Sequence, residues 1–168
     1  IRRVPKVVPE GWSSQRAGAL QEAHRDLLRF VKDQPVGTEA GAIYSPDMKL
    51  LERRMGAAHE IRMPHYSGEH ILIHNHPDGL IFSGADIGKF ILSRSMEILT
   101  AIGNDGTLYV IQKTLMYDGF MARQQYLGLK EILQECVKAG NMDRYISTIE
   151  DFLIGGSAYG LKFIKSRT

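Results

Sequence analysis

The feature that most constrains this chain is a short apolar run that stops at two histidines, a proline and a glycine. Residues 70–73 read His-Ile-Leu-Ile, a branched apolar run that predicts a buried strand. Side chains two residues apart in a strand point to the same side, so His74 and His76 share one face at its end. Pro77 and Gly79 then stop the strand and turn the chain. The sequence therefore predicts a strand that presents two imidazoles beside a turn.

A helix is predicted directly after this turn. Ser83 has the residue type of an N-cap and Asp86 falls in the first helical turn, ahead of apolar residues at helical spacing. Taken singly, each residue has an ordinary explanation, such as a core histidine or a carboxylate facing the helix dipole. Together, two imidazoles and one carboxylate with an open fourth position form the ligand set of a catalytic zinc site. We therefore expect His74, His76 and Asp86 to bind Zn²⁺.

Glu39 is the candidate acid/base. Residues 36–44 lie between two proline-containing segments that interrupt regular structure, which predicts a strand. Glu39 is the only acidic residue of this strand. A charge in a central strand is costly unless it is used. The alternative is a charge that protects an edge strand from pairing with other chains. Glu60 and Glu69 compete for the role but fit better as solvent-exposed charges that flank strands.

This order of residues resembles the motif of the JAMM (MPN+, JAB-domain) zinc metallopeptidases: an upstream glutamate, then His-x-His-Pro, then Ser-x-x-Asp. The match covers about residues 36–112. The resemblance implies that the two histidines and the aspartate bind zinc. It also implies that Glu39 is acid/base to the zinc-bound water and that Ser83 helps to hold the tetrahedral oxyanion.

Two details of the motif bear on which members of the family the chain resembles. Five residues separate Pro77 from Ser83, where the family usually has six. The sequence His-Asn-His-Pro is more similar to the motif of the bacterial RadC-type and phage or toxin-associated branch than to that of the eukaryotic deubiquitinases. The implied reaction is hydrolysis of a peptide or isopeptide bond in a peptide or protein substrate.

Three alternatives to this function remain open. The first is a non-catalytic scaffold with the same fold, and the second is a RadC-like or phage-assembly protein that acts near DNA. The third is an HNH nuclease, suggested by the literal His-Asn-His. Asn75 is expected to point away from both histidines, which disfavours the nuclease.

The net charge and the cysteine content limit the classes of partner and the cellular compartment that we expect. Lys and Arg number 21 against 19 Asp and Glu, a net charge of +2, so the chain shows no strong electrostatic demand for nucleic acid. The single cysteine, Cys136, excludes an intrachain disulfide framework and is expected to be a core thiol in a reducing, cytoplasmic compartment. No apolar run approaches the ~18 residues of a membrane span.

We expect an α/β fold of the JAB/MPN type, with a mixed, curved sheet flanked by helices and a helical C-terminal extension. Residues 1–12 read as an extended arm, and residues 13–116 as the metallohydrolase domain, which opens with a helix. Residues 117–168 read as the helical extension, with an apolar stripe that we expect to pack on the domain. An interface that forms a homo-oligomer is the alternative.

Within the domain, residues 49–63 predict two short strands around Gly56. His59 and His65 read as ordinary surface or interface histidines, and the alternative for His65 is a place in the lining of the cleft. Residues 96–112 predict a hairpin, because an Asp-Gly pair is a strong turn signal.

Overall fold

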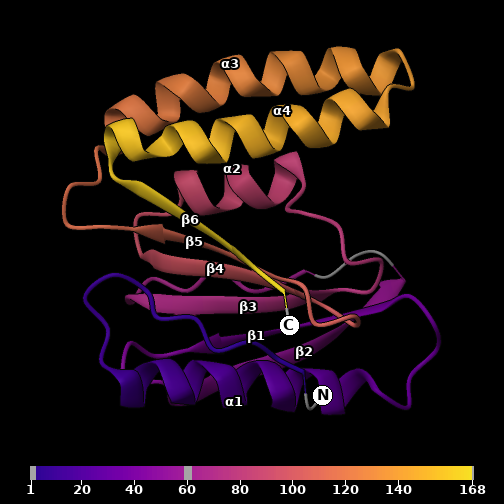
Figure 1. Cartoon of the computed structure of the whole chain (residues 1–168), viewed down its shortest axis with the longest axis vertical. Coiled ribbons are helices and arrows are strands. Elements are labelled where there is room, and N and C mark those ends of the chain that lie inside the picture. Colours follow the sequence, from indigo (N-terminus) through magenta and orange to yellow (C-terminus); the bar gives the residue numbers. More distant parts are fainter. Residues whose placement is uncertain (1–2, 59–61, 168) are drawn as a thin grey trace.

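The computed structural model describes residues 3–58 and 62–167, and it arranges them as one sheet between two layers of helices (Figure 1). The sheet has six strands in the order β2-β1-β3-β4-β5-β6. Their bounds are Thr38–Tyr44 (β1), Leu50–Ala58 (β2), His70–His76 (β3), Met96–Gly103 (β4), Leu108–Lys113 (β5) and Leu161–Ser166 (β6). The pair β3–β4 is parallel and the other pairs are antiparallel. The predicted α/β fold with a mixed sheet flanked by helices is confirmed.

The helices divide unequally between the two faces (Figure 1). Helix α1 (Ser14–Val31) covers one face. Helix α2 (Gly84–Leu92) covers the other and forms the crossover that a parallel strand pair requires. Helices α3 (Gly119–Lys138) and α4 (Met142–Gly155), followed by the short 3₁₀ turn η1 (Gly156–Tyr159), pack over α2. None of these described helices is both long and apolar enough to cross a membrane.

Two hydrophobic clusters lie on the two faces of the sheet. In β3, Ile71 and Ile73 belong to the cluster under α1, and Leu72 belongs to the cluster under α2. The strand is therefore buried on both faces, which explains why its sequence is continuously apolar instead of alternating. Side chains alternate between the two faces along the strand. Beyond the apolar run, every second residue counted from Leu72 therefore faces α2.

Several sequence predictions agree with these elements. The helix predicted to open the domain is α1, whose N-cap Ser13 accepts a hydrogen bond from the Arg16 amide through its hydroxyl. Strands β4 and β5 form the predicted hairpin. Residues 3–12 contain neither helix nor strand, and Val4, Val7 and Trp12 of this arm are buried in the cluster under α1.

The prediction of two short strands around Gly56 is wrong. Residues 50–58 form one strand that pairs with β1 from Tyr44↔Leu50 to Thr38↔Ala58. Glycine weakens a strand without ending it, and pairing with β1 on both sides of Gly56 keeps this segment extended. His59 and Glu60 lie outside the described residues, and Glu69 is exposed.

The prediction that the chain is helical to its end is also wrong. Helix α4 ends at Gly155, and after Gly160 the chain forms β6 along β5. Gly160 has φ +78°, and a side chain there would collide with the backbone of Met116. Leu161 and Ile164, whose spacing suggested a helix, instead pack on opposite faces of the sheet.

Candidate metal centre

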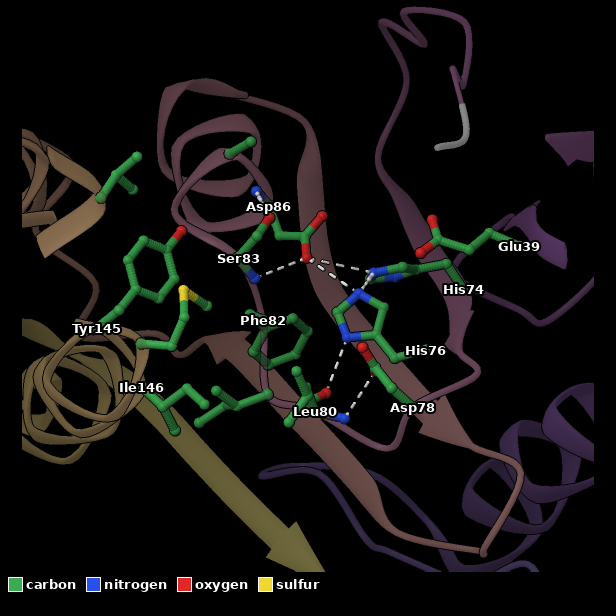
Figure 2. Close-up of a pocket in the computed structure, with 14 residues that line it drawn as sticks. Glu39, His74, His76, Asp78, Leu80, Phe82, Ser83, Asp86, Tyr145 and Ile146 are labelled. Carbon is green, nitrogen blue, oxygen red and sulfur yellow. Dashed lines mark hydrogen bonds and ion pairs between the residues drawn. The ribbon is translucent and has the colours of Figure 1, made fainter. Parts of the chain in front are cut away.

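Strand β3 and helix α2 bring the three predicted metal ligands to one point (Figure 2). His74 and His76 lie on the same side of β3 as Leu72, facing α2. His74 is 4% exposed. Asp86 lies in the first turn of α2 and points back toward both imidazoles. The five-residue connection between Pro77 and Ser83 is thus long enough to bring the helix start to the strand end.

The donor atoms of the three side chains lie close enough together to surround one ion. His74 Nε2 and His76 Nε2 are 2.9 Å apart, and Asp86 Oδ2 lies 3.5 Å and 3.3 Å from them respectively. A four-coordinate zinc with bonds of about 2.0–2.2 Å separates its ligand atoms by about 3.3–3.6 Å. The two distances to the carboxylate oxygen fall in this range, and the distance between the two imidazole nitrogens is shorter. Imidazole nitrogen and carboxylate oxygen are both donor types that zinc takes, and among the described residues these three form a group that could hold a metal.

Hydrogen bonds behind the donor atoms orient two of the three ligands. The carbonyl of Leu80 lies 2.8 Å from His76 Nδ1, so that nitrogen donates and Nε2 keeps its lone pair for a metal. The backbone amide of Ser83 donates to Asp86 Oδ2 at 2.9 Å. His74 Nδ1 is buried without a hydrogen-bond partner in the described structure, and that ring packs instead against Phe82.

The electrostatics of the cluster favour a bound cation. Burial alone would raise the pKa of Asp86, but the charges and hydrogen bonds of the two histidines hold it well below its usual range. Burial lowers the pKa of His76, but Asp86, the Leu80 carbonyl and the charge of Glu39 raise it above its usual value. The carboxylate is therefore ionised, and a metal ion would take the place of the proton that Asp86 favours on His76.

Glu39 reaches the same site from β1. The β1–β3 ladder pairs Gly41 with His74, and the same register continued by two residues would place Glu39 opposite His76. Glu39 is half-buried and lines the cleft beside the histidines (Figure 2). Because β1 lies between β2 and β3, the alternative explanation of Glu39 as an edge-strand charge is wrong.

Ser83 has a structural role that the sequence also predicted. It is the N-cap of α2: its hydroxyl oxygen accepts a hydrogen bond from the Asp86 amide at 3.1 Å, while Asp86 returns a bond to the Ser83 amide. A hydroxyl that accepts in this way still has its own proton to donate. Ser83 also lines the cleft that the three predicted metal ligands line.

The cleft has a wall that sequence reasoning missed. It encloses about 500 Å³, and its far side consists of Val137 from α3 and of Met142, Tyr145 and Ile146 from α4. The Tyr145 hydroxyl accepts a hydrogen bond from the Gly84 amide at 2.8 Å, which ties α4 to the start of α2. Val137 fell within the stripe predicted to be buried, yet it is 63% exposed. Its place in the apolar stripe of α3 was the only signal in the sequence.

The other candidate residues do not join the site. Glu69 and His65 are exposed and do not line the cleft. Asn75 turns away from both histidines, as predicted, and hydrogen-bonds to the backbone of β1. Comparison of the chain with protein-family models, with curated proteins and with solved structures gave no match. The functional argument therefore depends on the geometry of the site itself.

Proposed function

We propose that this protein is a zinc-dependent hydrolase of peptide or isopeptide bonds, of the kind that the resemblance to JAMM metallopeptidases implies. The observation that carries the proposal is the convergence of two imidazole nitrogens and one carboxylate oxygen within 3.5 Å of one another, beside a half-buried glutamate. A buried structural ion pair would need neither the second histidine nor the glutamate. The open cleft next to the three donors supplies a place for a substrate.

Each residue then has a distinct task. His74, His76 and Asp86 would hold the ion beside the cleft that they line. A zinc ion in such a site lowers the pKa of a bound water toward neutrality and polarises a carbonyl group. Glu39 takes the proton of the attacking water and passes it to the leaving amine.

Ser83 and the cleft wall act on the substrate. The Ser83 hydroxyl donates a hydrogen bond to the oxyanion that develops on the attacked carbonyl. The side chains of α3 and α4 form an apolar surface on the wall of the cleft opposite the metal ligands. A substrate residue next to the scissile bond can pack against this surface. The helices beyond the motif therefore contribute to substrate binding in this proposal.

Zinc analysis of purified variants tests the ligand set. His74→Ala and Asp86→Ala should each abolish stoichiometric zinc, because two remaining ligands hold the ion far more weakly. His65→Ala is the matched control, since His65 is exposed and outside the cleft, and this variant should retain full zinc. Asp86→Ala also removes half of a helix cap, a loss that typically costs about 1 kcal/mol, so folding is checked by circular dichroism. Full zinc in both ligand variants would contradict the site.

Glu39→Gln separates metal binding from catalysis. The amide keeps the shape of the side chain but cannot accept a proton, so zinc should stay bound while hydrolysis of a fluorogenic peptide library falls by about 10²–10⁴-fold. Loss of zinc in this variant would make Glu39 a ligand instead of the acid/base.

A further inference from the structure

The regular pairing of β1 with its two neighbouring strands is interrupted around Glu39. The ladder between β1 and β3 ends at the pair Gly41↔His74. On the other side, the register between β1 and β2 shifts between Thr38 and Ala40. The pairing of β1 with β2 resumes at Thr38↔Ala58, so β1 is irregular at Glu39. A general base must nevertheless be held within hydrogen-bond reach of its proton.

The side chain of Asn75 spans the gap that the ladder leaves. Its Nδ2 donates to the Thr38 carbonyl at 3.0 Å, and its Oδ1 accepts from the Ala40 amide at 2.6 Å. One primary amide thus binds the residue before Glu39 and the residue after it. Asn75 is completely buried, so neither backbone group has ready access to water as a substitute.

We propose that Asn75 is the positioning residue for Glu39: its side-chain amide clamps the chain on both sides of Glu39 and so holds the Glu39 carboxylate at the metal cleft. The consequence for catalysis rests on the proposed hydrolase function, whereas the clamp itself does not. Alternation along β3 turns Asn75 away from the cleft, toward the side of Ile71 and Ile73. Asn75 therefore acts through Glu39 and does not touch a substrate.

The chemistry of the clamp requires an amide. It needs one donor and one acceptor at the same distance from the main chain, which asparagine supplies and no other side chain of that length does. Aspartate would set a second acceptor against the Thr38 carbonyl, and leucine would leave two buried backbone groups unpaired. The middle residue of the His-Asn-His sequence therefore has a task of its own.

Amide hydrogen exchange followed by NMR tests the clamp without any assay of activity. In the wild-type protein the Ala40 amide should exchange slowly. In Asn75→Leu its exchange should be at least about tenfold faster, while the amide of Ala42, which pairs with Ile73, should keep its rate. Asn75→Ala is a second variant in case leucine prevents folding, because the smaller side chain admits water to the two backbone groups. An unchanged Ala40 rate in a folded variant would overturn the proposal.

A double-mutant cycle tests whether Asn75 works through Glu39. With a fluorogenic peptide library as substrate, Asn75→Leu should keep stoichiometric zinc and an unchanged KM but lower kcat by about 10–100-fold, as expected for a displaced catalytic group. Adding Asn75→Leu to Glu39→Gln should slow the reaction no further. Additive losses in the double variant would overturn the proposal.

A matched control comes from Thr100, another fully buried polar residue of the same sheet, which contacts His24 of α1 on the face opposite the cleft. Thr100→Val should lower stability and leave kcat and the Ala40 exchange rate unchanged. A wild-type protein that binds no zinc and cleaves no peptide would contradict the proposed hydrolase, and with it the catalytic part of the inference. The exchange experiment would still decide whether Asn75 holds the chain around Glu39.

Discussion

The stability of this protein should depend on pH through one buried histidine on the face of the sheet opposite the cleft. His24 of α1 is completely buried, and its Nε2 lies 2.7 Å from the hydroxyl of Thr100, which is equally buried. Burial lowers the pKa of His24 from 6.5 to about 3. Between these two values the unfolded chain binds a proton at this position that the folded chain does not. Stability is therefore complete above about pH 6.5 and is lost as the pH falls.

The size of this effect follows from the two pKa values. Each pH unit below 6.5 removes about 1.4 kcal/mol, so about 2 kcal/mol is lost at pH 5 and at most about 5 kcal/mol at pH 3. The double variant His24→Leu, Thr100→Val removes the titrating ring and its hydroxyl partner together, which avoids leaving one of them unpaired. Its free energy of unfolding relative to the wild type should rise by about 2 kcal/mol between pH 7.5 and pH 5.

Urea denaturation at several pH values, with a chelator present in all samples, measures this difference. Other groups that titrate, including the histidines of the cleft, are common to both proteins and cancel in the comparison. A difference in free energy that stays constant from pH 7.5 to pH 5 would refute the reasoning, because His24 would then titrate alike in the folded and unfolded chains.

Two further predictions concern the helical layer and the substrate. Gly88→Ala should destabilise the fold by about 1–3 kcal/mol, because a Cβ there would lie 2.7 Å from Cζ of Tyr126. Gly128→Ala in α3 meets nothing within 4 Å and should stabilise by about 0.5–1 kcal/mol, and the same urea titrations measure both; equal effects would contradict the close α2–α3 packing. The compact chain leaves little room for segments that hold ubiquitin, so we expect negligible cleavage of a Lys-linked ubiquitin dimer in a gel assay. Efficient cleavage of this dimer by the wild-type protein, abolished in Glu39→Gln, would contradict the prediction and indicate a deubiquitinase.

The strand–turn–helix unit could be predicted because its signals are local. A strand that ends in His-x-His, a turn with proline and glycine, and a Ser-x-x-Asp cap each depend on neighbours a few residues away. The structure shows the strand end, the capping box and the approach of the three donor atoms.

The remaining parts of the site depend on contacts that are distant in the sequence. Glu39 stands beside the histidines because of the β1–β3 register, which no pattern within either strand reveals. Tyr145 enters the cleft because α4 packs over α2, and its sequence looked like any apolar stripe. The final strand was mistaken for a helix because Leu161 and Ile164 are three residues apart, a spacing that fits both structures when each face of a strand is partly covered.

Anomalous diffraction at the zinc absorption edge, from crystals of the wild-type protein loaded with one equivalent of zinc, tests the central claim most directly. The account predicts one fully occupied peak bonded to His74 Nε2, His76 Nε2 and a carboxylate oxygen of Asp86, at about 2.0–2.2 Å from each. The carboxylate of Glu39 should lie within reach of a water at the open position. A zinc-loaded crystal with no peak among these three residues, or with its full-occupancy peak elsewhere, would contradict the account.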